Sequence, residues 1–330
     1  MKRVDIIIIG FGTVGRGLAT IIRKNGSLAR DRFGVDIRIV GIADLRGSMM
    51  DPEGLDIDDA LEWKCEISPV NSIELISKGE YDLMVETTPS DVTTGEPAFT
   101  HIKTALNLGK AVVTSNKGPI ALYYRELMEL SERTGSPFRF EASVGGAMPI
   151  INLIRDNLAG NQILGIKGIF NGTCNYILTR MAEEGLPYEY VLSEAQSLGI
   201  AEADPSYDVD GIDTAEKLTI LANAVMGMDI AYHDVSVEGI RRITPDTLKL
   251  ALDKGYVVKL IGEAVNGKIE VAPRLVPRDH PFALMRGTLN IAEITTDLSG
   301  PITVMGRGAG AIEAASAIFS DIISIYRSER

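Results

Sequence analysis

Short apolar runs alternate with amphipathic stretches in the first part of the chain. The apolar runs predict strands at Val4–Ile9, Asp36–Ala43, Asp82–Glu86, Ala111–Thr114 and Phe138–Glu141. Between several of them, apolar positions recur with the spacing of a helix, at Thr13–Arg23, Ala98–Leu108 and Ile120–Arg133. Strands that alternate with helices indicate βαβ units and a parallel sheet covered on both faces.

The pattern changes after about residue 145. Helical spacing continues at Pro149–Leu158, Asn175–Glu183, Glu189–Ser197 and Thr214–Met226, and strand-like runs follow at Val235–Ile243, Tyr256–Val265, Lys268–Leu275 and Leu289–Asp297. Asn266-Gly267 is a hairpin-turn signal. A last apolar stripe predicts a helix at Ala309–Tyr326. The predicted fold class is therefore α/β, a doubly wound parallel sheet followed by an α+β domain.

Composition and charge narrow the classes of function. The 330 residues are 45% hydrophobic and 24% charged, as in folded proteins, and the formal net charge is −12. This charge, without a basic cluster, argues against nucleic acid and against a membrane surface as partners. An anionic cofactor stays compatible, because main-chain amides can hold phosphates. No signal peptide or membrane-spanning run is visible, and two cysteines suggest neither a disulfide framework nor a metal site, so we expect a cytoplasmic protein.

The first chemical motif is a glycine-rich turn. Gly10-Phe11-Gly12-Thr13-Val14-Gly15 follows an apolar strand and opens a helix. In this context the glycines permit a tight turn, close approach of a pyrophosphate and helix–strand packing. Asp44 ends the second predicted strand, where an acid binds the adenosine ribose and favours NAD. Arg46, two residues on, would instead pair with a 2′-phosphate and favour NADP, so the choice between the cofactors stays open.

Further polar residues lie where a buried core does not require them. Lys117 follows the strand Ala111–Thr114, at the carboxyl edge where open α/β sheets bind ligands. Taken alone, however, this position is better explained by a lysine in a surface loop. Asp213 and Lys217 have i,i+4 spacing and share a helix face. A lysine beside a carboxylate suits proton transfer. The same spacing is also explained if Asp210 is the N-cap of the helix with Asp213 as its N3 partner, and if Asp213 and Lys217 form an ordinary surface ion pair.

Six stretches together resemble the homoserine dehydrogenase family. They are GFGTVGRGL at 10–18, TSNKGP at 114–119, EASVGGAMPI at 141–150, GIFNGTCNYILTRM at 168–181, AQSLGIAEADPSYDVDGIDTAEKLTILAN at 195–223 and GRGAGAIEAASA at 306–317. The resemblance implies a Rossmann-type dinucleotide-binding domain at 1–140, to which 305–330 returns. It implies a catalytic and dimerisation domain of α+β type at 141–304, and a homodimer.

The resemblance also implies the chemistry and its residues. A hydride passes between NADH or NADPH and aspartate semialdehyde, giving homoserine, in threonine and methionine biosynthesis. Lys217 is expected as the main proton donor with Lys117 assisting, and Asp213 as a catalytic and substrate-binding residue beside Glu202 and Asp208. The expected cofactor contacts are Gly10, Gly12, Thr13, Val14, Gly15, Asp44, Arg46, Thr87, Thr88, Lys117 and Gly306. A sodium or similar monovalent cation is expected at Glu141, Val144, Gly146 and Met148.

Two departures and two rival functions accompany this resemblance. The chain ends near residue 330, so we expect no added regulatory domain and no threonine feedback through one, and Ala315-Ser316 stands where relatives often have Thr-Ala. One rival is a phosphorylating aldehyde dehydrogenase, for which Cys174 would be the nucleophile although no histidine motif activates it. The other rival is a nucleotide-binding sensor without turnover.

Overall fold

The computed structural model describes residues 1–327, which form two compact units. The first unit consists of Met1–Ala147 together with the described residues from Gly310 to Arg327, and the second unit is Met148–Ala309. The first boundary therefore lies at Ala147 where the sequence suggests 140, and the chain re-enters the first unit at Gly310 where it suggests 305. No helix within residues 1–327 has the length and apolar character needed to cross a membrane.

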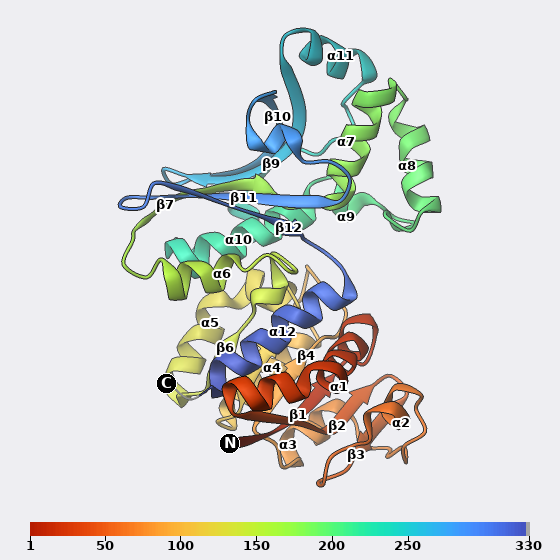
Figure 1. The fold of residues 1–330 in the computed structure, drawn as a ribbon, viewed down its shortest axis with the longest axis vertical. Helices are drawn as coiled ribbons and strands as arrows, with labels where there is room; N and C mark the ends of the chain where they lie inside the picture. Colours follow the sequence, from red (N-terminus) through yellow and green to blue (C-terminus); the bar gives the residue numbers. More distant parts are fainter. Residues whose placement is uncertain (328–330) are drawn as a thin grey trace. The chain divides into compact units, whose positions relative to one another are not determined.

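A six-stranded sheet forms the centre of the first unit (Figure 1). Its strand order is β3-β2-β1-β4-β5-β6, and all neighbouring strands are parallel except β2 and β3. This order reverses at β1, which creates a crevice between β1 and β4 at their carboxyl ends. The strands are β1 (Lys2–Ile9), β2 (Val35–Asp44), β3 (Gly47–Met50), β4 (Leu83–Glu86), β5 (Ala111–Thr114) and β6 (Phe138–Arg139).

Helices pack around this sheet, and the last helix of the chain lies beside the first one (Figure 1). The helices are α1 (Thr13–Phe33), α2 (Ile57–Leu61), α3 (Ser72–Lys78), α4 (Ala98–Asn107), α5 (Gly118–Thr134), the 3-10 turn η1 (Glu141–Ser143) and α12 (Ala311–Tyr326). Gly34 ends α1 in the left-handed conformation, which glycine adopts without steric penalty. Gly17 on α1 lies against the backbone of Ala311, so a small residue permits the close approach of α1 and α12.

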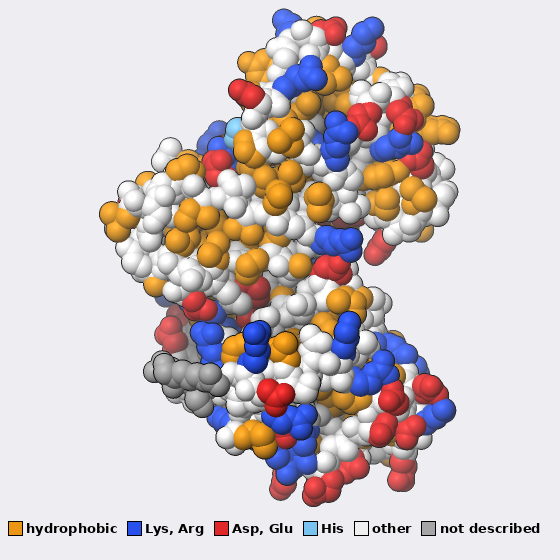
Figure 2. All heavy atoms as spheres, viewed as in Figure 1, with side chains coloured by type: hydrophobic (Ala, Val, Ile, Leu, Met, Phe, Trp, Pro, Cys, Tyr) orange, Lys and Arg blue, Asp and Glu red, His pale blue; other side chains and the backbone are white. Residues whose placement is uncertain are grey.

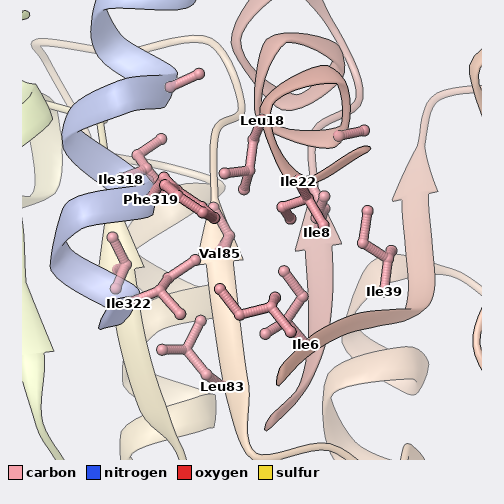
Figure 3. Packing of buried hydrophobic residues seen from close by; sticks show 14 of the residues in the cluster. Ile6, Ile8, Leu18, Ile22, Ile39, Leu83, Val85, Ile318, Phe319 and Ile322 are labelled. Atoms are coloured by element: carbon pink, nitrogen blue, oxygen red, sulfur yellow. The ribbon is translucent and has the colours of Figure 1, made fainter. Parts of the chain in front are cut away.

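Branched apolar side chains from the strands meet α1 and α12 in the core of the first unit (Figure 3). Leu18 and Ile22 project from α1 towards Ile8 on β1, and Ile318 and Ile322 project from α12 towards the strands. These five side chains are buried. Because such a core is close-packed, it fixes β1 and α1 and therefore the glycine turn that joins them.

The second unit is built on a mixed, mostly antiparallel sheet with the order β12-β11-β7-β9-β10-β8. The predicted turn joins β9 to β10, with Asn266 at φ 53° and Gly267 at φ 75°, as a tight hairpin requires. The strands are β7 (Ile163–Ile169), β8 (Ser236–Val237), β9 (Tyr256–Val265), β10 (Lys268–Pro277), β11 (Leu289–Thr296) and β12 (Pro301–Arg307).

Among the helical elements of the second unit, α7, α10, α11 and the 3-10 turn η4 contact the sheet directly. The helical elements are α6 (Ile150–Asn152), the π-helical turn η2 (Leu153–Asn157), α7 (Gly172–Glu184), α8 (Tyr188–Ser197), α9 (Ser206–Val209), α10 (Ile212–Met226), η3 (Tyr232–Asp234), α11 (Pro245–Asp253) and η4 (Pro281–Leu284). The sequence pattern predicts α7, α8 and α10 and, as Pro149–Leu158, the helical segment of α6 and η2. It misses β7, β12, α9, α11, η3 and η4 in this unit, and β3, α2 and α3 in the first unit.

Two strand predictions are wrong in part. The run Val235–Ile243 forms only the two-residue strand β8, because the amide of Ile240 bonds to the carbonyl of Val209 (2.8 Å) instead of a neighbouring strand. Gly239 also lies against the Val209 carbonyl, which a Cβ atom would approach to 2.3 Å. In the first unit, β6 ends at Arg139, and Glu141 begins a 3-10 turn rather than ending the strand.

Candidate active site

A cavity of about 1060 Å³ lies at the carboxyl edge of the sheet in the first unit. The glycine turn after β1 and the ends of β2, β4 and β5 form its walls. Eight of the residues expected to bind the cofactor line it: Gly10, Gly12, Thr13, Val14, Asp44, Arg46, Thr87 and Thr88. The cavity is thus open at the crevice where doubly wound sheets bind dinucleotides.

The three glycines of the turn have different surroundings. Gly10 has φ +91°, and a Cβ atom there would lie 2.6 Å from the backbone of Thr87 and Thr88. A Cβ atom on Gly15 would lie 2.3 Å from the carbonyl oxygen of Gly10. At Gly12, by contrast, a Cβ atom would meet nothing within 4 Å. The fold therefore requires glycine at positions 10 and 15, whereas at Gly12 the space is free for a ligand.

Asp44 and Arg46 form one ion pair at the end of β2. The Arg46 guanidinium donates Nη2 to Asp44 Oδ2 (2.7 Å), and the Arg46 amide donates to Asp44 Oδ1 (2.7 Å). The guanidinium also stacks over the Trp63 ring, 3.8 Å from its centroid. Both groups proposed to select the cofactor are thus held together at one corner of the cavity, and Trp63 provides an apolar support beneath Arg46.

Thr87 and Thr88 form the wall at the end of β4. Thr87 Oγ1 donates to the carbonyl of Gly10 (2.6 Å), which ties this wall to the glycine turn. Thr88 is contacted by Asn116, whose Nδ2 donates to the Thr88 carbonyl (3.0 Å). His101 lines the same cavity, although it belongs to no motif in the sequence. Asn116 lies in the TSNKGP stretch next to Lys117, and that adjacency was the available signal for it.

Lys117 lies at the start of α5, directly after β5. It is the N-cap residue of this helix, half-buried, and its carbonyl accepts hydrogen bonds from the amides of Ile120 and Ala121. Gly15 supports the turn from behind, and neither it nor Lys117 is among the lining residues of the cavity. Gly306 lies on β12 of the second unit, where its Cα faces Met148.

The second unit brings Lys217 and Asp213 together as a buried pair on α10. Lys217 Nζ donates to Asp213 Oδ2 (2.8 Å) and to the carbonyl of Phe170 (2.7 Å). The two side chains are only 9% and 6% exposed, so this is not the surface ion pair that the spacing also allowed. The N-cap of α10 is Gly211 rather than Asp210, and Asp210 instead pairs with Arg241.

Asn171 connects this pair to Asp208. Its Nδ2 donates to Asp208 Oδ1 (2.6 Å) and to Asp213 Oδ2 (2.9 Å), while its Oδ1 caps α7 by accepting from the amide of Cys174 (2.9 Å). Asn171 lies between β7 and α7, so the sheet and the helix fix its position. Its place in the GIFNGTCNYILTRM stretch marks the segment, but the sequence alone gives Asn171 no role.

Cys174 lies next to this network, but its environment opposes a nucleophilic role. The side chain is fully buried, and Sγ donates to the carbonyl of Asp208 (3.2 Å). Burial raises the pKa of the thiol well above its ordinary value, and the negative charges of Asp208 and Asp213 raise it further. A thiolate is therefore disfavoured here, which argues against the phosphorylating aldehyde dehydrogenase.

The ionised form of Asp208 destabilises the folded protein. Burial, followed by the charge of Asp213, raises the pKa of its carboxyl group. The folded state thus disfavours the ionised form, so the free energy of unfolding falls as pH rises from the ordinary carboxyl range through the raised pKa.

We expect Asp208→Asn to remove this penalty. At neutral pH the melting temperature should rise by about 2–4 °C, and the fall in stability with pH should become shallower. Thermal unfolding of both proteins across the acidic and neutral range measures this. Equal melting curves at neutral pH, or a lower melting temperature for the variant, would contradict it.

Glu202 is exposed, whereas the residues expected to bind a cation are buried. The carbonyl of Glu202 accepts from Gln196 Nε2 (3.0 Å). Glu141 is buried at the start of η1, and its amide donates to Asp321 Oδ2 (3.1 Å) on α12. Val144 and Met148 are buried as well, and Gly146 has φ +55°. Within residues 1–327, no cluster of three or more His, Cys, Asp or Glu side chains could hold a metal ion, so a cation at this segment would depend on main-chain carbonyls.

Comparisons with known proteins agree with this geometry. Residues 10–141 match the model of the homoserine dehydrogenase NAD-binding domain, and residues 149–323 match the homoserine dehydrogenase model. The chain is 49% identical to the homoserine dehydrogenase of Methanocaldococcus jannaschii, over 99% of each chain. It is 38% identical to the NAD(+)-dependent homoserine dehydrogenase of Pseudomonas canavaninivorans, over 99% of this chain and 97% of that one. The crystal structure of a putative homoserine dehydrogenase from Archaeoglobus fulgidus superposes with a TM-score of 0.93 at 44% identity, covering 98% of this chain and all of the other. The chain therefore belongs to the homoserine dehydrogenase family and is an NAD(P)-dependent oxidoreductase.

Proposed function

We propose that the chain interconverts L-aspartate 4-semialdehyde and L-homoserine by hydride transfer, as a step towards threonine and methionine. The observation that carries this proposal is the buried Lys217–Asp213 pair, held by Asn171 and the carbonyl of Phe170. A buried cation fixed by a carboxylate and a carbonyl is a costly arrangement for stability, and such arrangements are characteristic of active sites.

The cavity of the first unit would hold the cofactor, either NAD or NADP. The pyrophosphate would lie over Gly12, where space is free, and the amides at the start of α1 would bind it. The adenosine ribose would lie at the Asp44–Arg46 pair, and Thr87 and Thr88 would contact the other half. When bound, the nicotinamide supplies or accepts the hydride.

Lys217 would deliver the proton when the aldehyde is reduced and remove it when homoserine is oxidised. An ammonium group has three N–H donors, and the described residues accept two of those of Lys217. The third donor suits the substrate oxygen, on which negative charge develops as the hydride arrives. Lys117 would assist at the same oxygen. Asp213 would orient Lys217, and Glu202 and Asp208 would bind polar groups of the amino acid.

A monovalent cation, sodium by the family resemblance, is proposed at Glu141 and the carbonyls of Val144, Gly146 and Met148. The support is a buried carboxylate followed within a few residues by a left-handed glycine, in a stretch of glycines where carbonyls can turn towards an ion. Removing sodium by dialysis into a lithium or choline buffer should then lower the melting temperature of wild type more than that of Glu141→Gln. Equal responses of the two proteins would argue against a cation at this segment.

The assay of this function follows the ultraviolet absorbance of the reduced nicotinamide. Purified protein is mixed with homoserine and with NAD or NADP in turn, and the reverse reaction is run with aspartate semialdehyde. Reduction that requires homoserine supports the proposal, and the faster cofactor decides between the Asp44 and Arg46 interpretations. Cofactor binding without turnover in either direction would support the sensor instead.

A homodimer in a reducing cytoplasm completes the proposal. Apolar side chains such as Leu164, Leu289 and Met305 are exposed on strands of the second unit, and Figure 2 shows apolar side chains on its visible face. Exposed apolar groups of this kind favour association of protein surfaces. Both cysteines, Cys65 and Cys174, are free thiols, which suits a reducing compartment. Light scattering of the purified protein tests the dimer.

A further inference from the structure

Glu86, the last residue of β4, is a fully buried carboxylate that the proposed mechanism does not use. Its Oε1 accepts hydrogen bonds from the amide of Thr88 (3.1 Å) and from the Thr88 hydroxyl, and its Oε2 accepts from the Thr114 hydroxyl (3.2 Å). The amide and the hydroxyl of Thr88 both donate to Oε1, whereas the single proton of the Thr114 hydroxyl is shared between Oε2 and the closer main-chain carbonyl of Glu86 (2.9 Å). The two donors at Oε1 favour an ionised carboxylate, which is an acceptor only. The negative charge is therefore placed directly behind Thr88.

The groups around Glu86 form one wall of the cofactor cavity. Thr88, Asn116 and His101 line the cavity, whereas Glu86 lies behind them. His101 Nδ1 is 3.7 Å from Glu86 Oε1, and His101 Nε2 is hydrogen-bonded to Ser72 Oγ (2.9 Å). Asn116 Oδ1 is buried without a hydrogen-bond partner among residues 1–327. A buried amide oxygen without a partner at a cavity is available to accept a hydrogen bond from a ligand, for example from a carboxamide N–H.

The topology assigns this wall to the nicotinamide half of the cofactor. The glycine turn after β1 marks the pyrophosphate, and the Asp44–Arg46 pair at the end of β2 marks the adenosine. The strand order places β4 and β5 on the other side of β1 from β2. The remaining half of a dinucleotide would therefore lie on the side of the cavity that Thr88 and Asn116 line.

We propose that Glu86 is a positioning residue whose buried charge makes the site prefer the oxidised nicotinamide over the reduced one. This inference rests on the proposed function, because it requires the cofactor in this cavity. The oxidised ring carries a positive charge and the reduced ring does not. A carboxylate one side chain behind the wall, shielded from water, attracts only the oxidised form. Thr88, held at both its amide and its hydroxyl, keeps the wall at a fixed distance from the ring.

The decisive measurement is the ratio of the dissociation constants of the oxidised and reduced cofactor, each obtained by fluorescence titration. In Glu86→Gln the oxidised form should lose affinity relative to the reduced form, so that the ratio rises about three- to tenfold. A residue that only supports the fold would change both constants together and leave the ratio unchanged. An unchanged ratio in a folded Glu86→Gln protein overturns the proposal.

Three further variants separate charge from structure. Glu96→Gln removes a carboxylate that lines the same cavity but is exposed to water, and its ratio should equal that of wild type. Glu86→Asp keeps the charge and should keep most of the wild-type ratio even where both affinities fall.

Thr88→Val keeps Glu86 and removes only the bridging hydroxyl, so the affinities for the oxidised and the reduced cofactor should fall by the same factor. This variant tests the proposal even where Glu86→Gln does not fold, because a ratio that rises in Thr88→Val contradicts it.

The outcome is distinguishable from failure of the proposed function. If wild type binds both cofactors and oxidises homoserine while the Glu86 variants leave the ratio unchanged, the function stands and the role of Glu86 is wrong. If wild type binds neither cofactor, the proposed function itself fails.

Discussion

Replacing Lys217 by alanine should lower kcat for homoserine oxidation about a thousandfold and leave the dissociation constant of the cofactor within about twofold of wild type. The reason is that Lys217 is proposed to handle the proton at the substrate oxygen, whereas the cofactor cavity is built from residues of the first unit. Steady-state kinetics and fluorescence titration of the same preparations measure the two effects.

Two variants sharpen the interpretation. Lys217→Arg keeps the positive charge but cannot readily release a proton, so it should recover little of the lost activity. Lys259 is the matched control, because it is a buried lysine of the same unit that bonds to neutral acceptors, Asn175 Oδ1 (2.7 Å) and the Met285 carbonyl (2.6 Å). Burial lowers the pKa of Lys259 to about 8, so its charge is already disfavoured in the folded state. Lys259→Met should therefore retain kcat within a few fold, and an equal loss in both lysine variants would show a general effect of disturbing the unit rather than proton transfer.

Gly12→Ala should weaken cofactor binding, whereas Gly15→Ala should destabilise the fold, although the two positions lie only three residues apart. At Gly12, with φ −81° and open space for a Cβ atom, alanine should leave the free energy of unfolding within about 0.5 kcal/mol of wild type. The methyl group would occupy the space proposed for the pyrophosphate, so the dissociation constant of the cofactor should rise about a hundredfold.

At Gly15 the Cβ atom would lie 2.3 Å from the carbonyl oxygen of Gly10, a backbone atom that cannot move without shifting β1. We expect a loss of about 3 kcal/mol in the free energy of unfolding. Denaturant titration without cofactor, followed by binding measurements, separates the two variants. If the Gly12→Ala protein binds the cofactor as tightly as wild type does, the pyrophosphate does not lie at this position.

Much of the architecture follows from local sequence. The alternation of apolar runs and helical spacing predicts the parallel sheet, because a strand buried on both faces is apolar at successive positions. The strand β5 has the predicted bounds, and β9 and its turn to β10 follow from ten alternating or apolar residues and Asn266-Gly267. The glycine turn is equally local, since its conformation and its place before a helix depend on adjacent residues.

Other elements depend on distant partners. The strand β12 alternates between exposed and half-buried positions, and it becomes a strand by pairing with β11. The run Val235–Ile243 has strand propensity but leaves the sheet after β8, because Val209 offers a carbonyl to Ile240. Such competition between partners cannot be seen in a window of neighbouring residues.

The residues of the candidate site show the same division. Spacing along the chain is enough to predict that Asp213 and Lys217 share a helix face and that a glycine turn opens α1, and the motifs alone indicate the family. The tertiary structure is needed to show that the Asp213–Lys217 pair is buried, because the pair is covered by contacts with Phe170 and Asn171, more than forty residues earlier in the chain. It likewise decided the place of Glu86 behind the cavity wall, since its partner Thr114 lies on the neighbouring strand β5. Spacing along a helix follows from local geometry, whereas burial and the choice of hydrogen-bond partners arise only when distant segments pack together.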